Sequence, residues 1–107
     1  MQIIDALYTY GLNEKKLHKI QKKVRHGVKV PNLYLVVMPL FQDGLLEIYP
    51  YYQLLQPFYK TMWDDITVVG MASSKGTATE IIQNIAQEMC DNRINIDEVG
   101  IREFLGI

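Results

Sequence analysis

The chain has 107 residues, of which 49% are hydrophobic and 21% charged, and its formal net charge is −1. These values indicate one globular domain, residues 1–107, and exclude an intrinsically disordered chain. Cys90 is the single cysteine, which excludes an internal disulfide or a CxxC metal site and favours a reducing, cytoplasmic location. We expect a protein of bacterial type. We expect no leader and no membrane association, since the start lacks a signal-peptide pattern and no apolar run approaches ~20 residues.

The charges are unevenly distributed along the chain. Residues 1–30 hold seven basic and two acidic residues, whereas residues 31–107 hold four basic and ten acidic ones. Such an asymmetry can steer an acidic partner to one end of the molecule, or it can let two surfaces of the same protein pair.

The first two elements are predicted to be helices. Four apolar residues recur at helical spacing near the start of the chain: Ile3, Ile4, Leu7 and Tyr8. They predict a short helix over residues 2–10 that ends at Gly11. Asn13 is a suitable N-cap for a second helix over about 13–26, which has an apolar face opposite a lysine-rich face.

Three strands are predicted in the middle of the chain. Residues 33–38 are uncharged and rich in β-forming side chains, and residues 45–49 follow the turn signal Gln42-Asp43-Gly44, so the two runs form a hairpin. Residues 66–71 form the third strand. The connection before it is long enough for a crossover that would set it parallel to the second strand.

Three further segments are predicted to be helical or left open. Residues 51–60 are ambiguous between a helix and an extended chain, because Pro57 would break the end of a helix. Residues 77–91 have an amphipathic pattern, and Thr77 with Glu80 matches a capping box. A last helix is predicted from near Asn95.

The resulting fold prediction is an α+β domain with a small three-stranded mixed sheet. The sheet consists of the hairpin 33–38/45–49 and the strand 66–71, and helices over about 13–26, 77–91 and 96–105 pack on it.

The first candidate site is the loop that joins the third strand to its helix. An anion would be bound there by Ser73, Ser74, Lys75, Gly76 and Thr77. Free backbone N–H groups and the helix dipole favour a phosphate or carboxylate at such a position. The alternative is that the hydroxyls cap the helix internally. The lysine precedes the last glycine, the reverse of a P-loop, so we do not assign that family.

The second candidate site is the lysine-rich face of the helix 13–26. A nucleic acid would contact Lys15, Lys19, Lys22, Lys23 and Arg25. Lysines suit phosphate contacts, but few side chains here are able to read bases. The alternative is an ordinary solvated helix face.

The third candidate site is an aromatic segment over residues 49–63. Six aromatic residues are concentrated in it: Tyr49, Tyr51, Tyr52, Phe58, Tyr59 and Trp63. Aromatic side chains are enriched at protein interfaces because each offers a large contact area. The alternative is that the rings cover the sheet and complete its core.

Catalytic chemistry is not indicated by the sequence. His18 and His26 are eight residues apart on one predicted helix, about 12 Å along its axis, so they cannot share a metal. We predict no cofactor. The primary hypothesis is a non-catalytic protein-binding or self-associating module, and the alternatives are a nucleic-acid-binding accessory protein and a small-anion or phosphometabolite binder.

Overall fold

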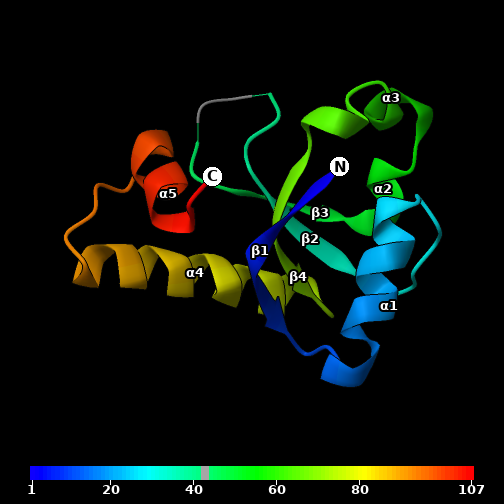
Figure 1. Cartoon of the computed structure of the whole chain (residues 1–107), viewed down its shortest axis with the longest axis horizontal. Helices are drawn as coiled ribbons and strands as arrows, with labels where there is room; N and C mark the ends of the chain where they lie inside the picture. Colours follow the sequence, from blue (N-terminus) through cyan, green and yellow to red (C-terminus); the bar gives the residue numbers. More distant parts are fainter. Residues whose placement is uncertain (42–43) are drawn as a thin grey trace.

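A mixed sheet of four strands forms the middle layer of the computed structural model, which describes residues 1–41 and 44–107 (Figure 1). The strands are β1 (Gln2–Tyr10), β2 (Tyr34–Val37), β3 (Glu47–Pro50) and β4 (Thr67–Ala72). Their order across the sheet is β1-β4-β2-β3. Strand β4 is parallel to β1 and antiparallel to β2, and β2 is antiparallel to β3.

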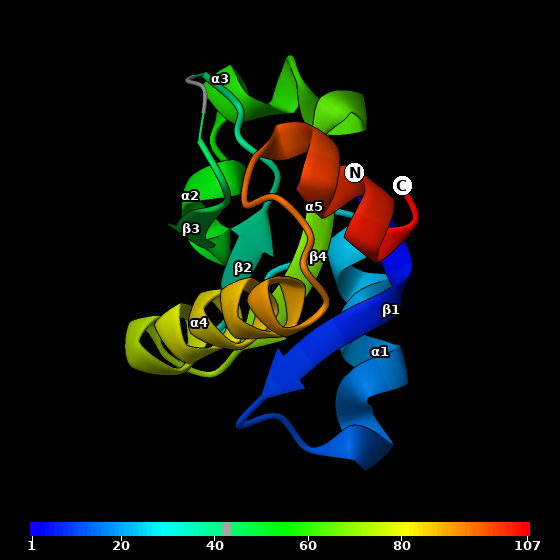
Figure 2. The same ribbon diagram turned by 90° about the vertical axis from the view of Figure 1, so that its left-hand side faces the viewer.

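Helices cover both faces of this sheet. They are α1 (Glu14–Arg25), α2 (Tyr51–Leu54), α3 (Pro57–Lys60), the 3₁₀ turn η1 (Trp63–Asp65), α4 (Lys75–Asp91) and α5 (Glu98–Leu105). Helices α4 and α5 lie on one side of the sheet, and α1, α2 and α3 lie on the other (Figures 1 and 2). Each face therefore has its own apolar core, one around Val36, Val69 and Ile85 and one around Leu35, Val68 and Leu54.

The structure confirms the α+β class and the hairpin. It also confirms the strand near 66–71 and the helices near 13–26, 77–91 and 96–105. The predicted parallel direction of the third strand relative to the second is confirmed, because β4 runs the same way as β3. The two are not neighbours in the sheet, since β2 lies between them. Part of the predicted turn Gln42-Asp43-Gly44 lies outside the described residues. Residues 51–60 form two short helical turns, and Pro57 begins the second, where its missing N–H costs nothing.

The helix predicted over residues 2–10 is wrong, because this segment is strand β1 and the sheet has four strands rather than three. A spacing of four residues places two side chains on the same face in both a helix and a strand. Ile3 packs toward the α1 side, whereas its neighbour Ile4 packs toward the α4 side. This alternation of adjacent residues belongs to a strand with both faces covered.

The starts of the last two long helices also differ from the prediction. Helix α4 begins at Lys75, and its capping box joins Ser74 to Thr77 rather than Thr77 to Glu80. The Thr77 N–H donates to Ser74 Oγ at 3.1 Å, and the Ser74 N–H donates to Thr77 Oγ1 at 3.1 Å. Helix α5 is capped by Asp97, whose Oδ1 accepts from the Gly100 N–H at 2.7 Å.

A bulge in β4 brings the sheet and α4 close together. Strand β4 passes from Val68 to Gly70 while β2 advances by one residue, so Val69 is the extra residue. Val69 belongs to the core on the α4 side, and Gly70 faces Ile81 of α4 on the same side. A Cβ atom on Gly70 would lie 3.1 Å from Ile81 Cγ2 and 3.3 Å from the Tyr8 carbonyl oxygen.

We predict that Gly70→Ala destabilises the protein. The added methyl group meets a backbone oxygen and two packed side chains, and such overpacking costs about 1–3 kcal/mol. Gly76→Ala is the matched control, because the nearest atom to its Cβ is Ser74 Oγ at 3.9 Å and alanine is favoured in a helix. Urea unfolding measures both variants, and equal stabilities for the two would contradict this packing.

Candidate functional site

One end of the sheet carries two of the candidate features. Tyr10, Ala72, Tyr34 and Pro50 are paired in a single row across all four strands. The loop 73–77 leaves the sheet beside this row, and a cavity lies next to its β2 and β3 members.

Two hydroxyl groups of the loop 73–77 are hydrogen-bonded within the protein. Ser74 and Thr77 form the capping box of α4, and the Thr77 hydroxyl also donates to the Ser74 carbonyl oxygen at 3.0 Å. The Ser73 N–H donates to the Tyr10 carbonyl oxygen at 3.2 Å. Gly11, which has a φ of 73°, lies directly against the Ser73 side chain. Lys75 and Gly76 are exposed in the first turn of α4. The five predicted residues lie together, and the hydroxyls of Ser74 and Thr77 among them are engaged in the helix cap.

The basic face of α1 is fully presented to solvent. The five predicted contact residues are all exposed: Lys15, Lys19, Lys22, Lys23 and Arg25. Within residues 1–41 and 44–107, the one ion pair joins Arg102 to Glu98 at 3.4 Å, so none of the α1 cations is paired there. This face therefore keeps its positive potential.

The aromatic segment 49–63 is divided among three environments. Tyr51 is a core residue with 1% of its surface exposed, whereas its neighbour Tyr52 is 67% exposed. Phe58 and Tyr59 belong to a surface cluster of rings, and Trp63 lies under the Lys60 ammonium, whose Nζ is 5.9 Å from the ring centroid. The segment is therefore not one continuous surface.

The surface cluster includes a ring that the sequence reasoning missed. The Phe41 ring stacks on the Phe58 ring with centroids 5.9 Å apart, and both also contact Tyr59. Tyr59 in turn packs edge-on against Tyr49. We name Phe41, Phe58, Tyr59 and Tyr49 the aromatic patch. Phe41 directly precedes the predicted turn Gln42-Asp43-Gly44. A large aromatic residue beside a turn signal is the sequence feature that could have indicated an exposed ring.

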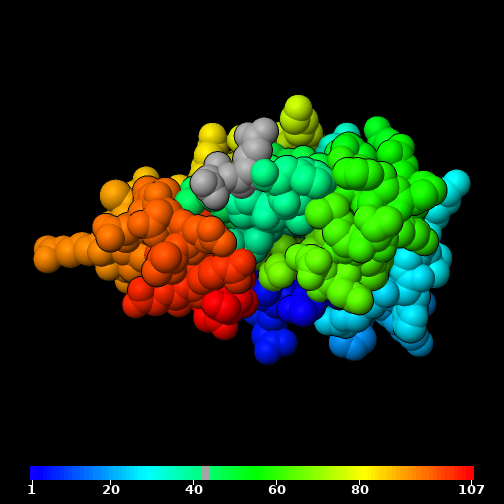
Figure 3. Space-filling view, turned by 90° about the horizontal axis from the view of Figure 1, so that it is seen from above, coloured from blue at the N-terminus to red at the C-terminus, as the bar shows by residue number. Residues whose placement is uncertain are grey.

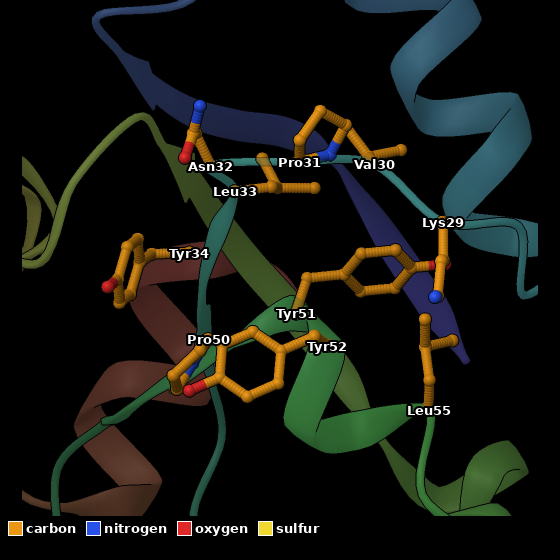
Figure 4. A pocket seen from close by; sticks show the side chains of 10 residues that line it. All are labelled: Lys29, Val30, Pro31, Asn32, Leu33, Tyr34, Pro50, Tyr51, Tyr52 and Leu55. Atoms are coloured by element: carbon orange, nitrogen blue, oxygen red, sulfur yellow. The ribbon is translucent and has the colours of Figure 1, made fainter.

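A cavity of ≈ 300 Å³ lies between the 29–34 segment and α2 (Figure 4). Val30, Pro31 and Leu33 line one side, and Pro50, Tyr52 and Leu55 line the other. The Tyr51 ring points between them toward Lys29, the one charged lining residue. Its hydroxyl donates to the Val28 carbonyl oxygen at 2.9 Å, which holds the loop onto α2. The cavity is at the lower limit of small-ligand pockets in size.

We predict that three of the seven tyrosines ionise at a higher pH than an ordinary tyrosine does. Burial raises the pKa of Tyr51 to about 12. Burial and then the neighbouring Glu88 raise the pKa of Tyr8 to about 12, and burial with Glu47 does the same for the pKa of Tyr49. Because the unfolded chain loses these protons near pH 10, the free energy of unfolding should fall as the pH rises from 10 to 12.

Absorbance at 295 nm during alkaline titration measures this behaviour. Tyr51→Phe should remove one late-ionising group and cost about 1 kcal/mol, because the Val28 carbonyl loses its donor. Tyr52→Phe is the control, since its ring is exposed. Ionisation of all seven tyrosines in one step near pH 10 in the folded protein would contradict the structure.

No group of three or more His, Cys, Asp or Glu side chains gathers as a metal site within residues 1–41 and 44–107, and Cys90 is exposed on α4. None of the helices among these residues is long and apolar enough to cross a bilayer.

No protein-family model, curated protein or solved structure matches the chain significantly.

Proposed function

We propose that this protein is a non-catalytic binding module that pairs with a second copy of itself through the aromatic patch. The observation that carries this proposal is the stacked pair Phe41 and Phe58, with 54% and 62% of their surfaces exposed. Exposed rings in contact form an apolar surface that water solvates poorly, and aromatic rings dominate the binding energy of protein interfaces.

The rings are held in place before any partner arrives. Phe58 meets Tyr59 edge-on with centroids 5.1 Å apart, and Tyr59 meets Tyr49 in the same way at 5.8 Å. The Tyr59 hydroxyl also accepts a hydrogen bond from Gln53 Nε2 at 2.9 Å. Little side-chain entropy is therefore lost on binding.

A second copy is the occupant that the charges of this surface favour. The four rings are uncharged, and the nearby carboxylate of Glu47 is engaged by the Leu40 N–H at 2.8 Å and the Tyr49 hydroxyl at 3.1 Å. The four rings themselves carry no charge that would repel a second copy, whereas the lysine face of α1 does. Two-fold dimers that bury the same patch on both chains are the commonest soluble oligomers.

The dimer should be weak. A stable interface buries about 800 Å² per partner, and two partly exposed phenylalanines supply only part of that area. We expect a dissociation constant of roughly micromolar order or weaker. Sedimentation velocity over a dilution series from about 1 to 500 μM measures this equilibrium.

The variants Phe41→Ser and Phe58→Ser should each weaken dimerisation by about tenfold or more, as for a central interface residue. Val99→Ser is the control, because Val99 is 74% exposed on α5 and outside the patch. Circular dichroism checks that each variant is folded. A strict monomer at the highest concentration, or equal weakening by Val99→Ser, would overturn the proposal and leave a different protein as the partner.

A further inference from the structure

We infer that a basic cavity between α1 and η1, together with the lysine face of α1, binds single-stranded nucleic acid with one base stacked on Trp63. This inference rests on a different surface from the aromatic patch and stands independently of dimerisation.

The cavity joins two segments that are distant in the sequence. It has a volume of ≈ 280 Å³ and is lined by Arg25, His26, Gly27, Lys60 and Trp63. Figure 3 shows the green surface of the 51–66 segment beside the blue-to-cyan surface of α1. Every lining side chain is basic or aromatic apart from Gly27, so the cavity suits a ligand that combines negative charge with a flat ring.

The positive charge continues from the cavity along α1. Five further exposed lysines lie on this helix: Lys15, Lys16, Lys19, Lys22 and Lys23. A helix of this length spans about 18 Å, so one strand of nucleic acid can meet several cations in succession. Glu14 is the one acidic residue on α1, and the exposed Asp64 and Asp65 follow Trp63 without lining the cavity.

Trp63 supplies a base-stacking surface rather than another charge. Its side chain is half-buried and packs at the edge of the core on the α1 side. Lys60 Nζ lies 5.9 Å from the ring centroid. A base can displace this flexible ammonium, which then reaches a neighbouring phosphate. A cationic track with an aromatic platform is the arrangement by which proteins bind single strands.

A duplex and a simple anion fit this arrangement less well. The bases of a duplex are stacked on each other, so the Trp63 ring would gain no partner, and an inorganic phosphate would use the charges alone. Single strands of DNA and RNA share the required chemistry, and separate oligothymidylate and oligouridylate titrations distinguish them.

Intrinsic fluorescence gives a direct test, because Trp63 is the only tryptophan in the sequence. Titration with an oligothymidylate or oligouridylate of about 12 nucleotides should quench its emission at low salt. Heparin, a polyanion without bases, should bind without comparable quenching. The logarithm of the affinity for the single strand should fall linearly with the logarithm of salt concentration.

Variants separate charge from stacking. The triple variant Lys22→Gln, Lys23→Gln, Arg25→Gln should reduce the magnitude of the salt slope by roughly 2, at about 0.7 per phosphate contact on a single strand. Trp63→Leu should weaken binding of a labelled oligonucleotide by about tenfold and leave the slope unchanged. Lys75→Gln on α4 is the control and should change neither quantity.

Three results would overturn the inference: no binding at low salt, quenching by heparin equal to that by the oligonucleotide, or tighter binding of a duplex. If Trp63→Leu does not fold, protection of Trp63 from acrylamide quenching in the unaltered protein replaces it. Unchanged acrylamide access in the presence of the bound oligonucleotide would equally contradict stacking.

Discussion

The contact between the bulge in β4 and helix α4 sets the spacing of the two main layers. Gly70 has no side chain, so Ile81 approaches the strand backbone to near van der Waals contact. The same bulge lets Val69 and Gly70 both face α4, while Val68 packs on the other side. Because β4 lies between β1 and β2, a shift at this point would move both neighbouring strands. The remaining elements are arranged around this fixed junction.

The two faces of the sheet differ in how they are covered. One face is covered largely by the 17-residue helix α4 with α5, whereas the other is covered by α1, two four-residue helices and a 3₁₀ turn. Short elements leave gaps and exposed rings between them. The aromatic patch, the apolar cavity beside Tyr51 and the basic cavity beside Trp63 all belong to this second side. The surfaces that we propose for binding thus lie where the covering layer is discontinuous.

The local pattern of apolar and polar residues correctly predicted the elements whose faces are buried or exposed uniformly along their length. Residues 33–38 are uncharged because β2 is buried on both faces, and the polar face of 13–26 is exposed along its whole length, so both predictions were confirmed. The prediction for residues 2–10 failed because i and i+4 share a face in a helix and in a strand. Ser74 and Thr77 have the same capping chemistry, so the sequence did not show which begins α4.

The candidate surfaces depended on tertiary contacts that no local pattern contains. Tyr51 and Tyr52 are adjacent, yet helix α2 directs one into the core and the other into solvent. Phe41 joins Phe58 across 17 positions, and Arg25 meets the Lys60 and Trp63 region across more than 30. The aromatic segment was correctly found as rich in rings, but its division into separate environments required the fold.

Amide hydrogen exchange tests most directly the claim that β4 is the centre of the molecule. Strand β4 has hydrogen-bonded neighbours on both sides and helices over both faces, so its amides should exchange only on global unfolding. Val68, Met71 and Ala72 should therefore show the highest protection, and Ile48 and Tyr49 of the edge strand β3 should exchange much faster. Protection of β4 no greater than that of β3 would contradict the account.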